Sequence, residues 1–336
     1  MNRDKLERRQ IPIYLIVVML AAAFGLLAPQ TAQGLAAWVT PAIAVLMYAM
    51  FLQIPFLELR QGLDDKRYMG ALLCANFILV PLLVWGLTRG LVDHPAILVG
   101  ALLVLLTPCI DYVVVFTHIG KGDSRLILAA TPLLLVLQLI LLPLYLALML
   151  EDGGAMSVSA GPFIEAFVLL IVLPMGLAVL TCAGARRSRL LARWSGGWAW
   201  LPVPAMAAVL VVVIGSQIAF VWQQLDSLLP VLSVYVGFLV LAPAAGALVA
   251  RGFGLSAGKA RSVVFSSSTR NSLVVLPLAL ALPEDIRGLA AAAVITQTLV
   301  ELLGELLYIR IVPALVWGRR SDRSPRNGLG DHSSQA

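Results

Sequence analysis

Long apolar segments dominate this sequence and restrict what it can fold into. Each is about 20 residues long, the helix length that crosses the roughly 30 Å hydrocarbon core of a bilayer. Apolar residues make up 60% of the chain and charged residues only 12%, which excludes a soluble globular domain and a disordered chain. We identify ten spans: Ile11–Ala28, Leu35–Leu57, Tyr68–Thr88, Pro95–Thr117, Leu126–Leu150, Pro162–Cys182, Trp198–Val221, Leu228–Ala250, Ser262–Leu282 and Gly288–Ile309. The sequence therefore predicts an all-α polytopic membrane protein with ten transmembrane helices.

The distribution of Lys and Arg predicts how these spans are oriented. If the N-terminus is cytosolic, all 24 of these residues except Arg89, Arg270 and Arg287 fall on the cytosolic side. This is a positive-inside pattern, so we expect a multi-pass protein of the plasma membrane, the inner membrane in bacteria, with both termini in the cytosol. The basic residues behind the net charge of +6 flank the spans on the cytosolic side, as expected of a membrane protein. We therefore expect no nucleic-acid partner.

Ten spans divide into two halves of five. Because five is odd, the second half enters the membrane in the opposite orientation, which predicts two inverted repeats with a site where they meet. The first repeat (spans one to five) and the start of span six occupy residues 1–182. The second repeat (spans six to ten) occupies residues 162–317, and residues 318–336 are expected to form a disordered cytosolic tail.

Polar residues interrupt the fourth span of each half. The interruptions are Thr107–Asp111 in the first half and Ser266–Asn271 in the second. Non-helical backbone at membrane depth is tolerated only where it lines a cavity or is buried in protein, and paired interruptions of this kind mark a transporter's binding site. Pro108 has no N–H and disfavours helix at the residue before it. We expect broken fourth and ninth helices that cross. The hydroxyl-bearing residues expected to line the site are Thr107, Ser266, Ser267, Ser268 and Thr269.

Three ionisable residues are predicted to lie at one depth in the membrane. At 1.5 Å per residue, Asp111 is roughly 10 Å, and Arg270 and Glu301 roughly 12 Å, from the cytosolic ends of their spans. We expect Asp111 and Arg270 to form an ion pair, which either belongs to the transport site or only docks the two halves. Glu301 is a carboxyl that could bind and release a proton during transport. Glu305 is expected to extend to the cytosolic edge and to meet Arg310.

Cys109 lies inside the first interruption, two residues from Asp111. A thiol there either packs as a small apolar group or binds a soft metal or metalloid. Asn76 and Gln297 are the other polar residues that we expect to reach the site. The three cysteines and three histidines form no metal-ligand pattern, and no nucleotide-binding or protease motif is present. We therefore expect no cofactor, no metal site and no enzymatic activity.

Two stretches of sequence carry a family resemblance. TPCID followed by VVVFTHIGKGD in the fourth span, and SSSTRNSLVVLPLALALP in the ninth, resemble the crossing helices of the bile acid/arsenite transporter superfamily. The sequence is most similar to the arsenite-resistance permeases, which have a Pro-Cys pair in the fourth span and a glutamate in the tenth, at Pro108-Cys109 and Glu301 here. The resemblance implies that Cys109 is the thiol used in trivalent arsenic transport and that Glu301 is a carboxylate needed for it.

The sequence departs from this superfamily in the second interruption. Sodium-coupled members have an acidic residue and a glutamine where Ser266 and Arg270 stand here, and a fixed guanidinium repels a cation strongly in a low dielectric. Arsenite permeases have an asparagine pair where this chain has Arg270-Asn271. The sequence thus represents a divergent branch in which sodium coupling is not expected.

Three functions follow from these features. We favour a secondary active transporter that exports arsenite, and antimonite, from the cytosol by proton antiport. Its site would be formed by Thr107, Cys109, Asp111, Ser268, Thr269, Arg270, Asn271 and Glu301. The second function is a proton- or sodium-coupled carrier of a small organic anion, with Arg270 binding the carboxylate. The third is a channel or membrane scaffold, which the concentration of charge at one depth disfavours. The oligomeric state is not indicated by the sequence.

Overall fold

The computed structural model describes residues 10–53, 64–110, 112–150 and 168–316, and every regular element in these ranges is a helix. Asp111 and the expected tail 318–336 lie outside the described residues. The elements of the first half are α2 (Gln10–Leu27), α3 (Pro29–Gln33), η1 (Gly34–Trp38), α4 (Val39–Phe51), α6 (Lys66–Cys74), η2 (Ala75–Leu79), α7 (Val80–Thr88), η3 (Arg89–Leu91), α8 (Pro95–Leu105), α9 (Val113–Ile119) and α10 (Ser124–Leu150). Those of the second half are η5 (Val168–Val172), α12 (Leu173–Ala185), α13 (Arg189–Trp198), α14 (Pro202–Gln223), α15 (Leu225–Gly252), α16 (Ala257–Ser268), α17 (Ser272–Leu280) and α18 (Glu284–Leu315).

The prediction of an all-α polytopic membrane protein is confirmed. The helices long and apolar enough to cross a membrane within the described residues are Pro29–Phe51, Lys66–Leu91, Ser124–Leu150, Pro202–Gln223, Leu225–Gly252 and Glu284–Leu315. Shorter apolar helices cover Pro12–Leu27, Pro95–Leu105 and Leu173–Ala185. The predicted fourth and ninth spans each consist of two short helices, α8 with α9 and α16 with α17, because their polar residues interrupt them. The count of ten spans stays a prediction.

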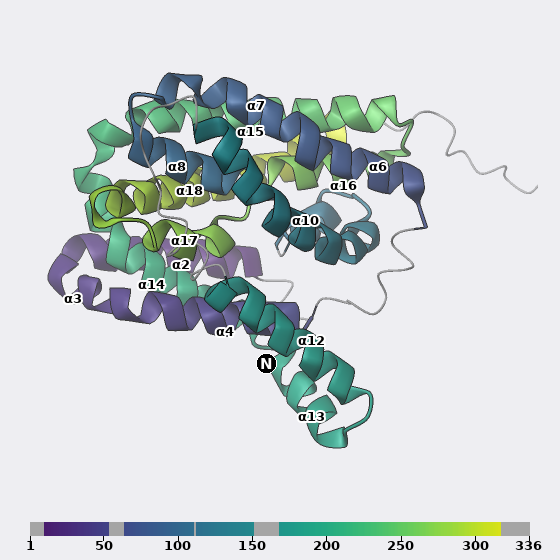
Figure 1. The fold of residues 1–336 in the computed structure, drawn as a ribbon, viewed down its shortest axis with the longest axis horizontal. Coiled ribbons are helices and arrows are strands. Elements are labelled where there is room, and N and C mark those ends of the chain that lie inside the picture. The colour runs from purple at the N-terminus through teal and green to yellow at the C-terminus, as the bar shows by residue number, and fades with distance from the viewer. Residues whose placement is uncertain (1–9, 54–63, 111, 151–167, 317–336) are drawn as a thin grey trace, which may run out of the picture.

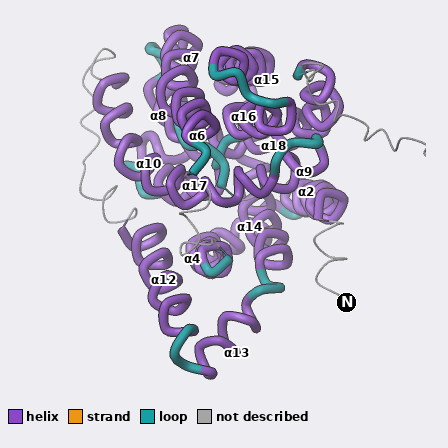
Figure 2. Tube along the Cα trace, turned by 90° about the vertical axis from the view of Figure 1, so that its right-hand side faces the viewer, coloured by secondary structure: helices purple, strands orange, loops and turns teal. Residues whose placement is uncertain are grey.

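The helices form two groups that lie side by side (Figures 1 and 2). In the flanking group, α14 packs against α2 and α4, and α12 packs against α4. In the site group, α15 packs against α16, and α18 packs against α8 and α17. The groups meet where α4 contacts α17 and where α14 contacts α18. The interrupted helices therefore lie in one group, and the other group borders them.

The packing partners of the two halves correspond to each other. In two repeats of five spans, α2 would correspond to α12 and α4 to α14. The pair α2 and α14 then corresponds to the pair α12 and α4, and both pairs are in contact. In the same way, the pair α8 and α18 corresponds to α16 and α10, which also pack together. This correspondence agrees with two inverted repeats, whose organisation and boundaries stay predictions.

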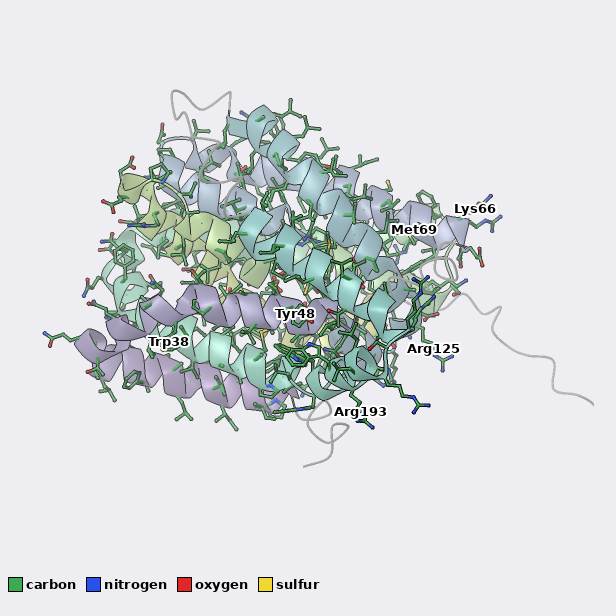
Figure 3. All side chains as sticks on the ribbon, turned by 60° about the horizontal axis from the view of Figure 1, so that its bottom comes forward. Trp38, Tyr48, Lys66, Met69, Arg125 and Arg193 are labelled. Atoms are coloured by element: carbon green, nitrogen blue, oxygen red, sulfur yellow. The ribbon has the colours of Figure 1, made fainter. Side chains whose placement is uncertain are left out.

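Basic residues gather toward one end of the helices. Figure 3 shows Lys66, Arg125 and Arg193 in its right-hand half, whereas Trp38 lies at the left. At the same end as Lys66, Asp65 caps α6 by accepting a hydrogen bond from the Tyr68 amide at 3.0 Å. The Asp65 carboxylate also pairs with Lys259 on α16, and this hydrogen bond lowers the pKa of Asp65 below its usual value. The two halves are therefore joined by an ion pair at this end.

Small residues let the site helices approach closely. A Cβ added at Gly100 on α8 would lie 2.4 Å from the carbonyl oxygen of Ala290 on α18. A Cβ added at Gly246 on α15 would lie 2.2 Å from the Ser267 hydroxyl of α16. Helix interfaces in membranes depend on such close approach because burial of apolar surface contributes little within lipid. These two glycines fix the distances of α8 from α18 and of α15 from α16.

Candidate functional site

The two interruptions lie against each other and pair through their backbones. The Cys109 N–H donates to the Thr269 carbonyl at 3.1 Å, and the Asn271 N–H donates to the Thr107 carbonyl at 2.9 Å. Pro108 and Arg270 face each other between these bonds as an isolated antiparallel bridge. The donors in this geometry are the N–H groups of Cys109 and Asn271, so the N–H that Pro108 lacks is not needed. Each interruption thus satisfies backbone groups of the other inside the membrane.

Side-chain hydrogen bonds define where the helices stop and restart. The Thr107 hydroxyl donates to the Leu103 carbonyl at 3.0 Å. The Ser268 hydroxyl donates to the Val264 carbonyl at 2.7 Å, so both hydroxyls are bonded back to their own helices. The Asn271 side chain accepts from the Val274 amide at 3.2 Å and caps α17.

Arg270 is fully buried and is held by neutral acceptors. Its Nη2 donates to Asn76 Oδ1 at 2.9 Å and to the Ser266 carbonyl at 2.7 Å. Its Nη1 reaches the Leu105 carbonyl at 3.4 Å, and its guanidinium carbon lies 5.5 Å from the centroid of the Phe238 ring. These contacts orient the guanidinium. An ion pair with Asp111 stays a prediction, because Asp111 lies outside the described residues.

Asn76 brings a third helix into the site. It lies in η2, a π-helical turn between α6 and α7, and such turns are frequent at functional sites. Its Nδ2 donates to the Ser266 hydroxyl at 3.0 Å, while its Oδ1 accepts from Arg270. The expectation that Asn76 reaches the site is confirmed.

Glu301 connects α18 to both interruptions. Its side chain is only 3% exposed, and its Oε2 accepts from the Arg270 backbone N–H at 3.0 Å and from Gln297 Nε2. Its Oε1 lies 2.5 Å from the Tyr112 hydroxyl, which is also 2.9 Å from the Arg270 carbonyl. Gln297 thus reaches the site as expected. Tyr112 was missed in the sequence, although it directly follows the first interruption.

The expected position of Glu305 is wrong. Its side chain is 0% exposed and lies 2.6 Å from the Thr269 hydroxyl rather than reaching Arg310 at the membrane edge. The reason is that α18 continues past Arg310 to Leu315. At 1.5 Å per residue, Glu305 is therefore about 15 Å from the end of its helix. Two carboxyls from α18, Glu301 and Glu305, contact the second interruption.

A small cavity and several unpartnered polar atoms mark the same region. The cavity holds about 10 Å³, which is room for about one water molecule. Its lining residues are Leu105, Tyr235, Phe238, Leu239, Ser268, Gln297, Val300, Glu301 and Tyr308. Buried side-chain atoms without a hydrogen-bond partner include Arg270 Nε, Asn271 Nδ2, Ser272 Oγ, Gln297 Oε1 and Glu305 Oε2. Donors and acceptors without a partner are thus concentrated in this region.

Cys109 is fully buried beside this cluster, and its backbone is bonded to Thr269. Among the described residues, no group of three or more His, Cys, Asp and Glu side chains is arranged to hold a metal ion. A soft ligand would therefore meet one thiol. The facing segment adds two side-chain donors without a partner, Arg270 Nε and Asn271 Nδ2.

Comparison with known proteins gives two matches. Residues 40–224, more than half of the chain, match the profile of the Sodium Bile acid symporter family. This match includes the first interruption and ends before the second. The chain is also 23% identical to the arsenical-resistance protein Acr3 of Corynebacterium glutamicum in an alignment of 341 positions. The alignment covers 92% of this chain and 88% of that protein.

Proposed function

This chain belongs to the Sodium Bile acid symporter family, and on that premise we propose that it is a secondary active transporter that exports arsenite from the cytosol by proton antiport. Antimonite, with the same soft trivalent chemistry, is a second substrate in this proposal. The protein acts in the bacterial inner membrane, with its N- and C-termini in the cytosol.

The observation that carries the choice of substrate is the position of Cys109. Its thiol is buried in the first interruption, and its backbone pairs with Thr269, the residue before Arg270. Thiols bind soft metalloids, and the unpartnered nitrogens of Arg270 and Asn271 offer donors for the hydroxyl groups of arsenous acid. The similarity to an arsenical-resistance protein over 92% of the chain supports the same choice.

The buried charges support protons as the coupling ion. Arsenous acid is neutral at pH 7, so its export against a gradient requires a second ion. The fixed guanidinium of Arg270 lies at the second interruption, where it would repel sodium in a low dielectric. Carboxyl groups bind and release protons, and the candidates are Asp111 in the first interruption and Glu301 on α18, which contacts the second.

Transport requires the site to open. A cavity of about 10 Å³ holds one water molecule and excludes a hydroxylated metalloid. The site group and the flanking group meet at the contacts of α17 with α4 and of α18 with α14. We expect these contacts to change when substrate enters or leaves.

Arsenite retention in bacterial cells that lack their own exporters tests the proposal. Expression of the protein should lower cell arsenite and raise resistance, and Cys109→Ser should abolish both effects. Cys74→Ser is the matched control, because Cys74 is only partly buried and lies outside the interruptions. Unchanged arsenite accumulation in cells that express the protein would refute arsenite export.

One observation favours a second candidate, a carrier of a small organic anion. Arg270 Nε is buried and unpartnered, and a guanidinium is a strong ligand for a carboxylate. Uptake of organic acids by the same cells, with and without sodium, distinguishes the candidates. Transport of an organic acid that is lost in Arg270→Ala, together with unchanged arsenite retention, would establish the second candidate instead of the first.

A further inference from the structure

Glu305 and Thr269 share more contacts than one hydroxyl proton can supply. The Thr269 Oγ1 lies 2.7 Å from the Phe265 carbonyl oxygen and 2.6 Å from Glu305 Oε1. A threonine hydroxyl has one proton, and a carbonyl oxygen only accepts. If Thr269 donates to Phe265, the proton between Thr269 and Glu305 must come from Glu305. A protonated Glu305 therefore supplies each of the two short contacts with its own proton.

The other oxygen of Glu305 agrees with a neutral side chain. Glu305 Oε2 is buried and has no hydrogen-bond partner. A buried carboxylate with one donor and one bare oxygen is costly, whereas a neutral acid loses far less on burial. Glu301 differs. The Tyr112 hydroxyl makes the same two kinds of contact, with Glu301 Oε1 and with the Arg270 carbonyl. What distinguishes Glu301 is its other oxygen, which accepts from two N–H donors, Arg270 N and Gln297 Nε2, where Glu305 has none. Glu301 is thus surrounded as a carboxylate should be.

The charged and titratable groups around Glu305 offer it no counter-ion. On α18 itself, Glu301 precedes it by one turn and Tyr308 follows it within one turn. Arg270, which follows Thr269 in the sequence, directs its guanidinium to neutral acceptors. No ion pair of Glu305 occurs among the described residues. The other titratable groups on elements packed against α18 are Cys109 and Tyr112, in and next to the first interruption, His118 on α9, Asp226, Tyr235 and Arg251 on α15, and Lys259 and Arg261 on α16. Lys259 pairs with Asp65, and Arg261 donates to the carbonyls of Pro313 and Val316.

We propose that Glu305 is held as a neutral carboxylic acid that donates to Thr269, and that it carries the proton exchanged for substrate. Loss of this proton turns Glu305 into a second carboxylate, one turn from Glu301, and ends its donation to Thr269. The single Thr269 hydroxyl proton can then serve either Glu305 or the Phe265 carbonyl, and no longer both contacts at once. The Thr269 carbonyl accepts the Cys109 N–H at 3.1 Å, so the change reaches the backbone that holds the thiol. The protonated form keeps the interruptions closed against α18, and the ionised form requires water and opens them.

Infrared spectroscopy of the purified protein tests the protonation state without any substrate. The carbonyl stretch of a protonated carboxylic acid should be present at pH 7 in the wild type and lost in Glu305→Gln. Glu301→Gln should keep it, and so should Glu284→Gln, an exposed residue of the same helix. In Glu305→Gln the new side-chain amide would still donate to Thr269, so we expect this variant to fold. An unchanged band in a folded Glu305→Gln protein would overturn the assignment.

Coupling to export rests on the function proposed above and is measured in reconstituted vesicles. With arsenite on both sides, Glu305→Gln should still exchange it, whereas accumulation driven by a pH gradient should be lost. Gradient-driven accumulation that persists in Glu305→Gln would overturn the coupling role. If wild-type protein moves no arsenite, arsenite export is refuted together with this coupling, while the infrared band still decides whether Glu305 is protonated.

Discussion

Tyr112→Phe removes one hydroxyl from the centre of the site and leaves its ring in place. The ring packs edge-on against Phe116, with centroids 6.0 Å apart, and a phenylalanine preserves this contact. The hydroxyl lies 2.5 Å from Glu301 Oε1 and 2.9 Å from the Arg270 carbonyl. Its loss leaves Glu301 Oε1 without that donor while the carboxyl stays buried.

The magnitude follows from the kind of hydrogen bond. A hydrogen bond to a charged group contributes about 1.5–3 kcal/mol, and removal of one partner leaves the buried group unsatisfied. If Glu301 must be held in this position in the rate-limiting step of transport, Tyr112→Phe raises the free energy of that step by the same amount. At 1.36 kcal/mol per factor of ten, the transport rate should fall about 10- to 150-fold.

Initial rates of arsenite transport in vesicles check this prediction. Tyr48→Phe is the matched control, because its hydroxyl lies 2.9 Å from the Thr181 hydroxyl, between α4 and α12 of the flanking group. It loses a hydrogen bond of similar geometry and should keep most of the wild-type rate. A Tyr112→Phe protein that transports at the wild-type rate would refute the idea that this hydroxyl positions Glu301.

Two further predictions concern the scaffold. Gly100→Ala places a Cβ 2.4 Å from the Ala290 carbonyl oxygen, so it should destabilise the protein by about 1–3 kcal/mol in thermal unfolding. Gly86→Ala is the control and should not destabilise it, because nothing lies within 4 Å of the added Cβ. Equal unfolding temperatures of the two variants would contradict the close approach of α8 and α18. Asp65 has a lowered pKa because Lys259 donates a hydrogen bond to it, so its contribution to stability is present above about pH 4 and is lost as the pH falls through the lowered pKa. The unfolding temperature of wild type should therefore exceed that of Asp65→Asn at neutral pH and approach it in acid, and a difference that does not depend on pH would contradict this ion pair.

The hydrophobic pattern predicted the fold class because the bilayer leaves few alternatives. A long apolar segment must be helical in lipid, so the described part of each predicted span contains helix. The interruptions could also be predicted, since Pro108 and the run Ser266–Asn271 are poor helix formers. The bounds of the second interruption were wrong, because Ser266–Ser268 are the last residues of α16 and only Thr269–Asn271 lie outside helix. Their backbone pairing required the structure, because a sequence does not show which polar backbone groups meet.

The site was predicted in part. Arg270, Glu301, Asn76 and Gln297 lie together as their polarity at membrane depth indicated. Tyr112 escaped notice because tyrosine is common in membrane proteins and signals a site only through its neighbours. Glu305 was misplaced because Arg310 resembled the end of a span, whereas the apolar residues after it extend α18 to Leu315. Helix ends near a single charge are difficult to predict from sequence, because long basic side chains reach the interface from within a helix.

Disulfide trapping between the interruptions tests most directly whether the two halves form one site. Thr269→Cys stands opposite the native Cys109 in the antiparallel bridge, where facing Cα atoms lie within about 5.5 Å, inside the range of a disulfide. Cys74 and Cys182 are replaced by serine, and a protease site is inserted at Ser188 between α12 and α13. After mild oxidation and cleavage, the two fragments should remain linked until a reductant is added. Fragments that separate without a reductant, in protein that is otherwise folded, would contradict the pairing of the interruptions.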